Sequence, residues 1–98
     1  MNVLQWLEVW YSRQCDGDWE HSQVVSITTL DNPGWSVDIF LGGTELEDKG
    51  FELLNIDRSD VDWVYGKVSD NIFQGRGGVN NLEEILQIFQ QWAMLNED

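Results

Sequence analysis

The chain has 98 residues, and 18 Asp and Glu against five Lys and Arg give it a formal net charge of −13 at pH 7. This charge excludes binding to nucleic acid or to an anionic membrane surface as a function, because both need clustered Lys and Arg. Two interpretations stay open: an acidic protein that is merely soluble, or one whose charge attracts a basic protein partner.

Domains cluster at about 100 to 150 residues, so the whole chain, 1–98, is expected to form a single domain. Hydrophobic residues make up 42% of it, which is too large a share for a disordered chain. One Cys cannot form an internal disulfide, and no apolar stretch approaches the roughly 20 residues that span a bilayer. We therefore expect a soluble, cytoplasmic protein.

The first predicted element is an amphipathic helix from about Val3 to Cys15, with Asn2 as its N-cap and Gly17 just past its end. Its apolar stripe has helical spacing and consists of Val3, Leu4, Leu7, Trp10 and Tyr11. Trp6 and Val9 lie off this stripe. They either widen the buried face or leave a ring exposed for a partner.

Two strands are predicted next, over 23–31 and 35–41, because β-branched and apolar residues alternate with polar ones. Asn32-Pro33-Gly34 joins them. Pro suits the first central position of a type II turn and Gly the positive-φ position after it, so a type II turn is predicted. In the second strand one face is apolar and carries Trp35, Val37, Ile39 and Leu41.

Further strands are predicted over 51–58 and 61–69, followed by a short piece over 72–74. The glycine-rich stretch 75–78 is interpreted as a flexible hinge, since no Lys-Ser/Thr pair follows it as in a phosphate-binding loop. A last helix is capped by Asn80 or Asn81. Its buried stripe is Leu82, Ile85, Leu86, Phe89, Trp92 and Ala93.

These elements predict an α+β fold: an N-terminal helix, an antiparallel meander of four to five strands and a C-terminal helix. Strands joined by short turns pair antiparallel, because parallel neighbours need a long crossover. Both helices are expected to pack on one face of the sheet.

The segment from Cys15 to His21 concentrates potentially reactive side chains. Its acidic spacing resembles the start of a calcium loop, but the Gly and Glu that such a loop needs at its sixth and twelfth positions are replaced by His21 and Ile27. Zinc would need further Cys or His ligands, and the chain has one of each. No metal, cofactor or catalytic residue is therefore assigned.

Cys15 is an unfavourable nucleophile, because a reactive thiolate needs nearby positive charge or a helix N-terminus. Asp16, Asp18 and Glu20 follow it instead. His21 is interpreted as a hydrogen-bonded residue at the entry to a strand.

Several blocks of sequence together resemble one protein family. They are W-Y-S-R-Q-C-D-G-D-W-E-H at 10–21, T-L-D-N-P-G-W-S-V-D-I at 29–39, G-T-E-L at 43–46, R-S-x-x-D-W at 58–63 and G-x-G-G-x-x-N-L-E-E-I-L-x-I-F at 75–89. The combination is similar to the bacterial immunity protein 53 family of polymorphic toxin systems. The resemblance implies a small protein that binds and neutralises a cognate toxin domain.

The hypothesis is therefore a non-enzymatic immunity protein with an acidic, Trp-containing surface that covers a basic toxin, such as a nuclease. The predicted contact residues are Asp16, Asp18, Trp19 and Glu20, followed by Asp31 and Trp35, whose turn is expected near the same edge. The alternative is that these residues only fix the corner between the helix and the strand. A small sulfurtransferase-like enzyme using Cys15, and an interaction module with another partner, are the alternatives. The sequence leaves open whether the protein is a monomer or a homodimer.

Overall fold

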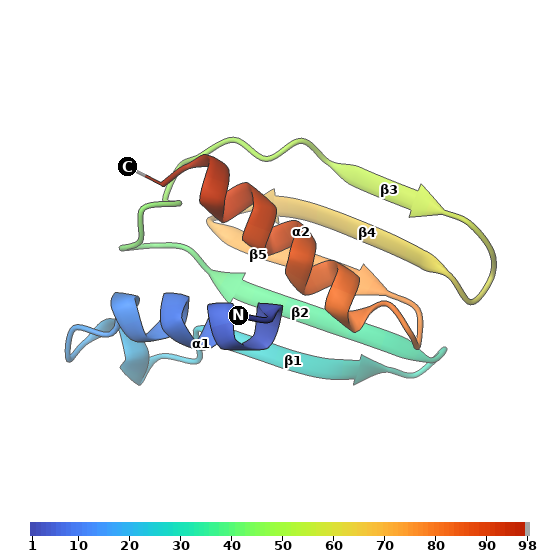
Figure 1. Cartoon of the computed structure of the whole chain (residues 1–98), viewed down its shortest axis with the longest axis horizontal. Helices are drawn as coiled ribbons and strands as arrows, with labels where there is room; N and C mark the ends of the chain where they lie inside the picture. The colour runs from blue at the N-terminus through green and yellow to red at the C-terminus, as the bar shows by residue number, and fades with distance from the viewer. Residues whose placement is uncertain (98) are drawn as a thin grey trace.

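The computed structural model describes residues 1–97 and confirms the α+β fold, with two helices and a five-stranded antiparallel sheet (Figure 1). The elements in chain order are α1 (Val3–Gln14), the short 3-10 helix η1 (Trp19–His21), β1 (Val25–Leu30), β2 (Gly34–Phe40), β3 (Leu54–Asp57), β4 (Trp63–Ser69), β5 (Ile72–Gly77) and α2 (Leu82–Leu95). The predicted helices are confirmed to within a residue or two at their ends.

The strands do not follow the sheet in chain order, as a simple meander would. Their order across the sheet is β1-β2-β5-β4-β3. After β2 the chain crosses through residues 41–53 to the far edge, and β3, β4 and β5 then return towards β2 (Figure 1). The predicted meander is therefore wrong in its strand order, although every pairing is antiparallel.

The glycine-rich stretch is not a hinge. Gly75 and Gly77 lie in β5, which is longer than the predicted piece and occupies the centre of the sheet between β2 and β4. A Cβ atom on Gly75 would collide with the side chain of Ile85, and one on Gly77 would lie 3.0 Å from Ile85 Cδ1. These glycines therefore allow α2 to approach the sheet closely.

The connection between β1 and β2 also differs from the prediction. Gly34 is not a turn residue but the first residue of β2, paired with Leu30, and the Asn32–Pro33 peptide bond is cis. The predicted type II turn is therefore wrong. The backbone of Gly34 lies against the carbonyl of Gly77, where a side chain would not fit.

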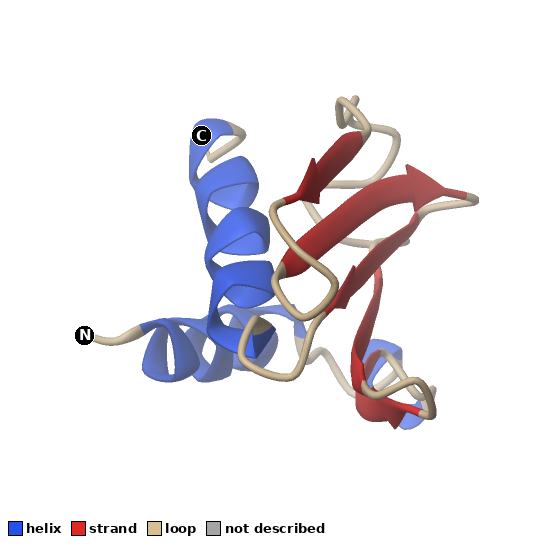
Figure 2. Ribbon diagram, turned by 90° about the vertical axis from the view of Figure 1, so that its right-hand side faces the viewer, coloured by secondary structure: helices blue, strands red, loops and turns tan. Residues whose placement is uncertain are grey.

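Both helices cover the same face of the sheet (Figure 2). Aromatic rings pack edge to face in the layer between them, an arrangement worth about 0.5–1.5 kcal/mol per pair beyond the burial of area. Phe89 of α2 is at the centre, with ring centroids 5.1 Å from Trp10 and 6.0 Å from Trp6. Trp6 is thus a core residue, which settles the alternative that its ring is exposed.

The buried face of α1 is rotated relative to the predicted stripe. Val3, Trp6 and Trp10 point into the core, whereas Leu4 is 56% exposed and Tyr11 is 36% exposed. Of the exposed apolar side chains of α1, that of Tyr11 lines the groove described below, together with the buried Leu7.

Candidate functional site

The candidate site lies where α1 ends and β1 begins. The helix ends at Gln14, and Cys15 is its C-cap. Gly17 has φ of 93°, a left-handed conformation that favours Gly, and allows the chain to turn away from the helix axis. The segment Cys15–His21, here called the carboxylate loop, then leads through η1 towards β1.

Two carboxylates hold this loop together from within. Asp16 Oδ1 accepts hydrogen bonds from the backbone N–H groups of Asp18 and Trp19, both at 3.0 Å. The two oxygens of Glu20 accept from the N–H groups of Asp16 at 2.9 Å and Gly17 at 2.8 Å. Backbone donors favour the charged form, so they hold the pKa of Asp16 and the pKa of Glu20 below their ordinary values. Both groups are therefore fixed negative charges.

Asp18 and Trp19 take different roles within the loop. Asp18 is exposed at the start of η1, and its side chain makes no capping bond. Trp19 is half-buried, and its ring packs against Trp10 at 6.0 Å and Tyr11 at 5.7 Å between centroids. Its Nε1 is buried and finds no acceptor among the described residues. Trp19 thus anchors the loop on α1, while Asp18 presents its charge to solvent.

More acidic side chains lie at the same end of the sheet. Trp10 Nε1 donates to Glu45 Oε1 at 3.0 Å, which ties the loop 42–50 to α1. Asp48 N donates to Asn71 Oδ1 at 2.9 Å, which ties that loop to the β4–β5 turn. The exposed carboxylates gathered at this end of the sheet are those of Asp16, Asp18, Glu47, Asp48 and Asp70.

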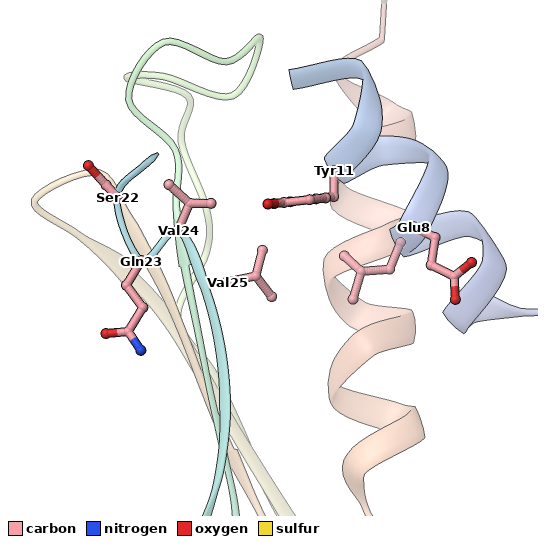
Figure 3. Close-up of a pocket in the computed structure, with 7 residues that line it drawn as sticks. Glu8, Tyr11, Ser22, Gln23, Val24 and Val25 are labelled. Carbon is pink, nitrogen blue, oxygen red and sulfur yellow. The ribbon is translucent and has the colours of Figure 1, made fainter. Parts of the chain in front are cut away.

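Next to the carboxylate loop is an open groove of ≈ 410 Å³ between α1 and the start of β1 (Figure 3). Its described lining residues are Leu7, Glu8, Tyr11, Ser22, Gln23, Val24 and Val25. The Tyr11 ring reaches from the helix towards β1, and the carboxylate of Glu8 turns outward at the rim (Figure 3). Partial burial and the neighbouring Cys15 raise the pKa of Tyr11, so it stays a neutral phenol. Tyr11 joins the groove to the loop, because its ring contacts both.

Asp31 and Trp35 do not join this site. They lie at the opposite end of β1 and β2, where the hairpin turns (Figure 1). The expectation that the turn comes near the same edge as the loop is therefore wrong, because the whole of β1 separates the two. Trp35 Nε1 donates to the carbonyl oxygen of Val79 at 3.0 Å, which ties the hairpin to the segment before α2.

Cys15 and His21 are both exposed. Cys15 Sγ donates to the carbonyl oxygen of Tyr11 at 3.3 Å, at the C-terminal end of α1. Among residues 1–97, no group of three or more His, Cys, Asp or Glu side chains is placed to hold a metal ion.

A second group of charged and polar side chains lies at the other end of the sheet. It is here called the Arg58 cluster and consists of Arg58, Asp62, Asn81 and Glu84. Arg58 donates to both oxygens of Asp62, at 3.0 and 2.9 Å, and to Glu84 Oε1 at 2.6 Å. Asn81 Nδ2 donates to the same two carboxylates at 2.9 and 3.0 Å. The guanidinium holds the pKa of Asp62 and the pKa of Glu84 below their ordinary values.

The groove is the part of the site that the sequence does not predict. Leu7 and Tyr11 have the spacing of a buried helical stripe, and Val24 and Val25 that of a strand. The groove exists because α1 packs mainly against α2 and stands off β1, and this depends on tertiary packing. One signal was available: a stripe containing Leu4, Leu7 and Tyr11 besides Trp6 and Trp10 is wider than one contact face can bury.

A family model described as Immunity protein 53 matches residues 4–94, nearly the whole chain. No curated protein and no solved structure matches the chain. Within residues 1–97 neither helix has the length and apolar character needed to cross a membrane.

Proposed function

The chain belongs to the Immunity protein 53 family, and from this premise we propose that it binds one cognate toxin domain in the cytoplasm and neutralises it by covering it, without transforming a substrate. The net charge of −13 favours a basic toxin, such as a nuclease, because opposite charges accelerate encounter. The acidic surface then accelerates association with the toxin, and apolar contacts slow the dissociation of the complex.

The carboxylate loop supports this proposal best. Asp16 and Glu20 are ionised and held by backbone N–H groups, so their charges keep their positions when a partner approaches. Such preorganisation lowers the entropy lost on binding. Trp19, packed on Trp10 and Tyr11, gives the loop a rigid base. We propose Asp16, Asp18, Trp19 and Glu20 as the toxin-contacting residues.

Asp31 and Trp35 belong to the contact only if the toxin extends along the whole of β1, since they lie at its other end. Glu20 is also a poor residue for testing charge alone, because replacing it would remove the acceptor for two backbone N–H groups. Asp18 is the better choice, since it is exposed and its side chain caps no backbone group.

The experiment compares Asp18→Lys with Asp60→Lys, an equal charge change on an exposed residue at the other end of the sheet. The probe is the catalytically inactivated toxin domain encoded by the neighbouring reading frame. We expect Asp18→Lys to slow association about threefold to tenfold at low salt, and Asp60→Lys to change it less than about twofold. Equal slowing would show that only total charge matters and that the loop is not the contact. Failure of the wild-type protein to rescue cells from the active toxin would overturn the proposed function itself.

A further inference from the structure

The two edge strands of the sheet differ in length and charge. β3 has four residues, contains Asp57 and is followed directly by Arg58. β1 has six residues, Val-Ser-Ile-Thr-Thr-Leu, none of them charged. Proteins usually protect an exposed edge with charges, Pro or a bulge, because its unpaired backbone groups can accept another strand. In a chain of this charge, an uncharged edge of this length is an open pairing site.

The backbone groups at this edge can be identified from the ladder. Phe40 N donates to the carbonyl oxygen of Val24 at 2.8 Å. Bonded and non-bonded pairs alternate along an antiparallel ladder, so the N–H and C=O groups of Val25, Ile27 and Thr29 point away from β2. Among the described residues, β1 is an edge strand and has no strand on its other side.

The same three residues turn their side chains towards the helix layer. Ile27 is directly opposite the fully buried Val37, so both lie on that face of the sheet. Ile27 is nevertheless 38% exposed, because α1 stands away from the edge. Ile27 follows the groove residue Val25 on the same face of β1. On the helix, Leu4 is 56% exposed and lies about one turn before the groove residues Leu7 and Glu8. A strand added here would find backbone partners at the edge and an apolar groove for alternate side chains.

We propose that the free edge of β1 pairs with an extended, basic segment of the toxin, whose alternate apolar side chains enter the groove between α1 and β1. This inference rests on the proposed function and names the structural mode of binding. Charge favours this occupant over a second copy of the chain, because two copies, each with a net charge of −13, would repel each other. Among the described residues lining the groove, Glu8 alone is charged. Asp18 and Asp31 lie beyond the two ends of β1, so a strand along this edge runs between acidic groups.

Amide hydrogen exchange tests the pairing without any substitution. In the free protein, the amides of Ser26 and Thr28 are expected to be protected by β2, and those of Val25, Ile27 and Thr29 to exchange quickly. On adding the inactivated toxin domain, the exchange of Ile27 and Thr29 should slow about 100-fold or more, while that of Ser26 and Thr28 changes little. If the complex forms and these edge amides still exchange quickly, the pairing is refuted although the proposed function stands. Absence of any complex would instead refute the proposed function.

Two substitutions on neighbouring residues provide the matched control. Ile27→Lys puts a cation on the groove side of β1, and Thr28→Lys puts the same charge on the opposite face of the same strand. We expect Ile27→Lys to weaken toxin binding at least about tenfold and Thr28→Lys less than about threefold, with unfolding temperatures measured for both. Equal weakening would refute the groove as the contact. Edge protection that appears in the free protein and rises with its concentration would show that a second copy occupies the edge, and would refute the toxin as occupant.

Discussion

The carboxylate loop and the Arg58 cluster lie at opposite ends of the sheet, and both fix acidic side chains in place, but with different donors. In the loop, the carboxylates of Asp16 and Glu20 accept from backbone N–H groups. In the cluster, Asp62 and Glu84 share the guanidinium of Arg58. Backbone donors carry no net charge, so the loop keeps its full negative charge, whereas the cation neutralises half of the cluster's two.

This difference shows why the number of acidic residues alone does not locate a binding surface. Both groups lower the pKa of their carboxyls, so both are ionised near neutral pH. What separates them is the charge left over for a partner. The loop has charge to offer and a groove beside it, and the cluster closes the corner between the β3–β4 connection and α2.

The largest effect on stability is expected in the Arg58 cluster. Asn81 is only 5% exposed, and its amide donates to both Asp62 and Glu84. Asn81→Ala removes these bonds from a buried position, so we expect the free energy of unfolding to fall by about 1–3 kcal/mol. Denaturant unfolding measures it. The control is the exposed neighbour Asn80→Ala, expected to cost less than about 0.5 kcal/mol. Equal losses would mean that the cluster is not a structural element.

Asn81 also illustrates what the sequence predicts and what it does not. The pattern places an Asn before α2 as its cap, and Asn81 does occupy that position. Its side chain, however, caps no helical N–H and binds the two carboxylates instead. Asp62 belongs to a turn 19 residues earlier, and no local pattern reveals that the two meet.

The same limit explains the other outcomes. Helix and strand periodicity located most elements, because the alternation of apolar residues is local. The sequence does not predict that β5 lies at the centre of the sheet. Its glycines indicate a flexible segment unless the close approach of Ile85 is known. Within the loop, the sequence points to residues whose role as contacts stays a prediction. It did not reveal that Asp16 and Glu20 bind the loop backbone while Asp18 does not.

A smaller difference between the Arg58 cluster and the carboxylate loop is expected in how the unfolding temperature changes with acid. The pKa of Asp62 lies below its ordinary value of 3.8 and that of Glu84 below 4.5, mainly because of Arg58. A carboxyl whose pKa is lowered in the folded state stabilises the protein at pH values above its ordinary pKa. This stabilisation is lost as the pH falls through the pKa of the folded state. Arg58→Gln should therefore lower the unfolding temperature at pH 7 and make its decline below pH 4.5 shallower.

Asp18→Asn is the matched variant in the loop, because Asp18 is exposed and its side chain caps no backbone group. It should leave the contribution of Asp62 and Glu84 to the acid response intact, because Arg58 is unchanged. The unfolding temperatures of the two variants are compared in thermal scans from pH 7 to pH 3. Acidification weakens the repulsion among carboxylates in both variants, so this effect cancels in the comparison. An unchanged acid response in Arg58→Gln would show that the guanidinium does not set the pKa of its partners.

The smallest effect is expected at Cys15, which begins the carboxylate loop. If the loop is a binding surface, the thiol contributes only its bond to the Tyr11 carbonyl, which a hydroxyl can also make. Cys15→Ser should then leave toxin binding within about twofold and protection of cells unchanged. A sulfurtransferase predicts the reverse, since Ser cannot form a persulfide. The test measures the transfer of sulfur from thiosulfate to cyanide. Activity in the wild-type protein that is abolished in Cys15→Ser would show that the loop belongs to a catalytic centre, which contradicts a role in binding alone.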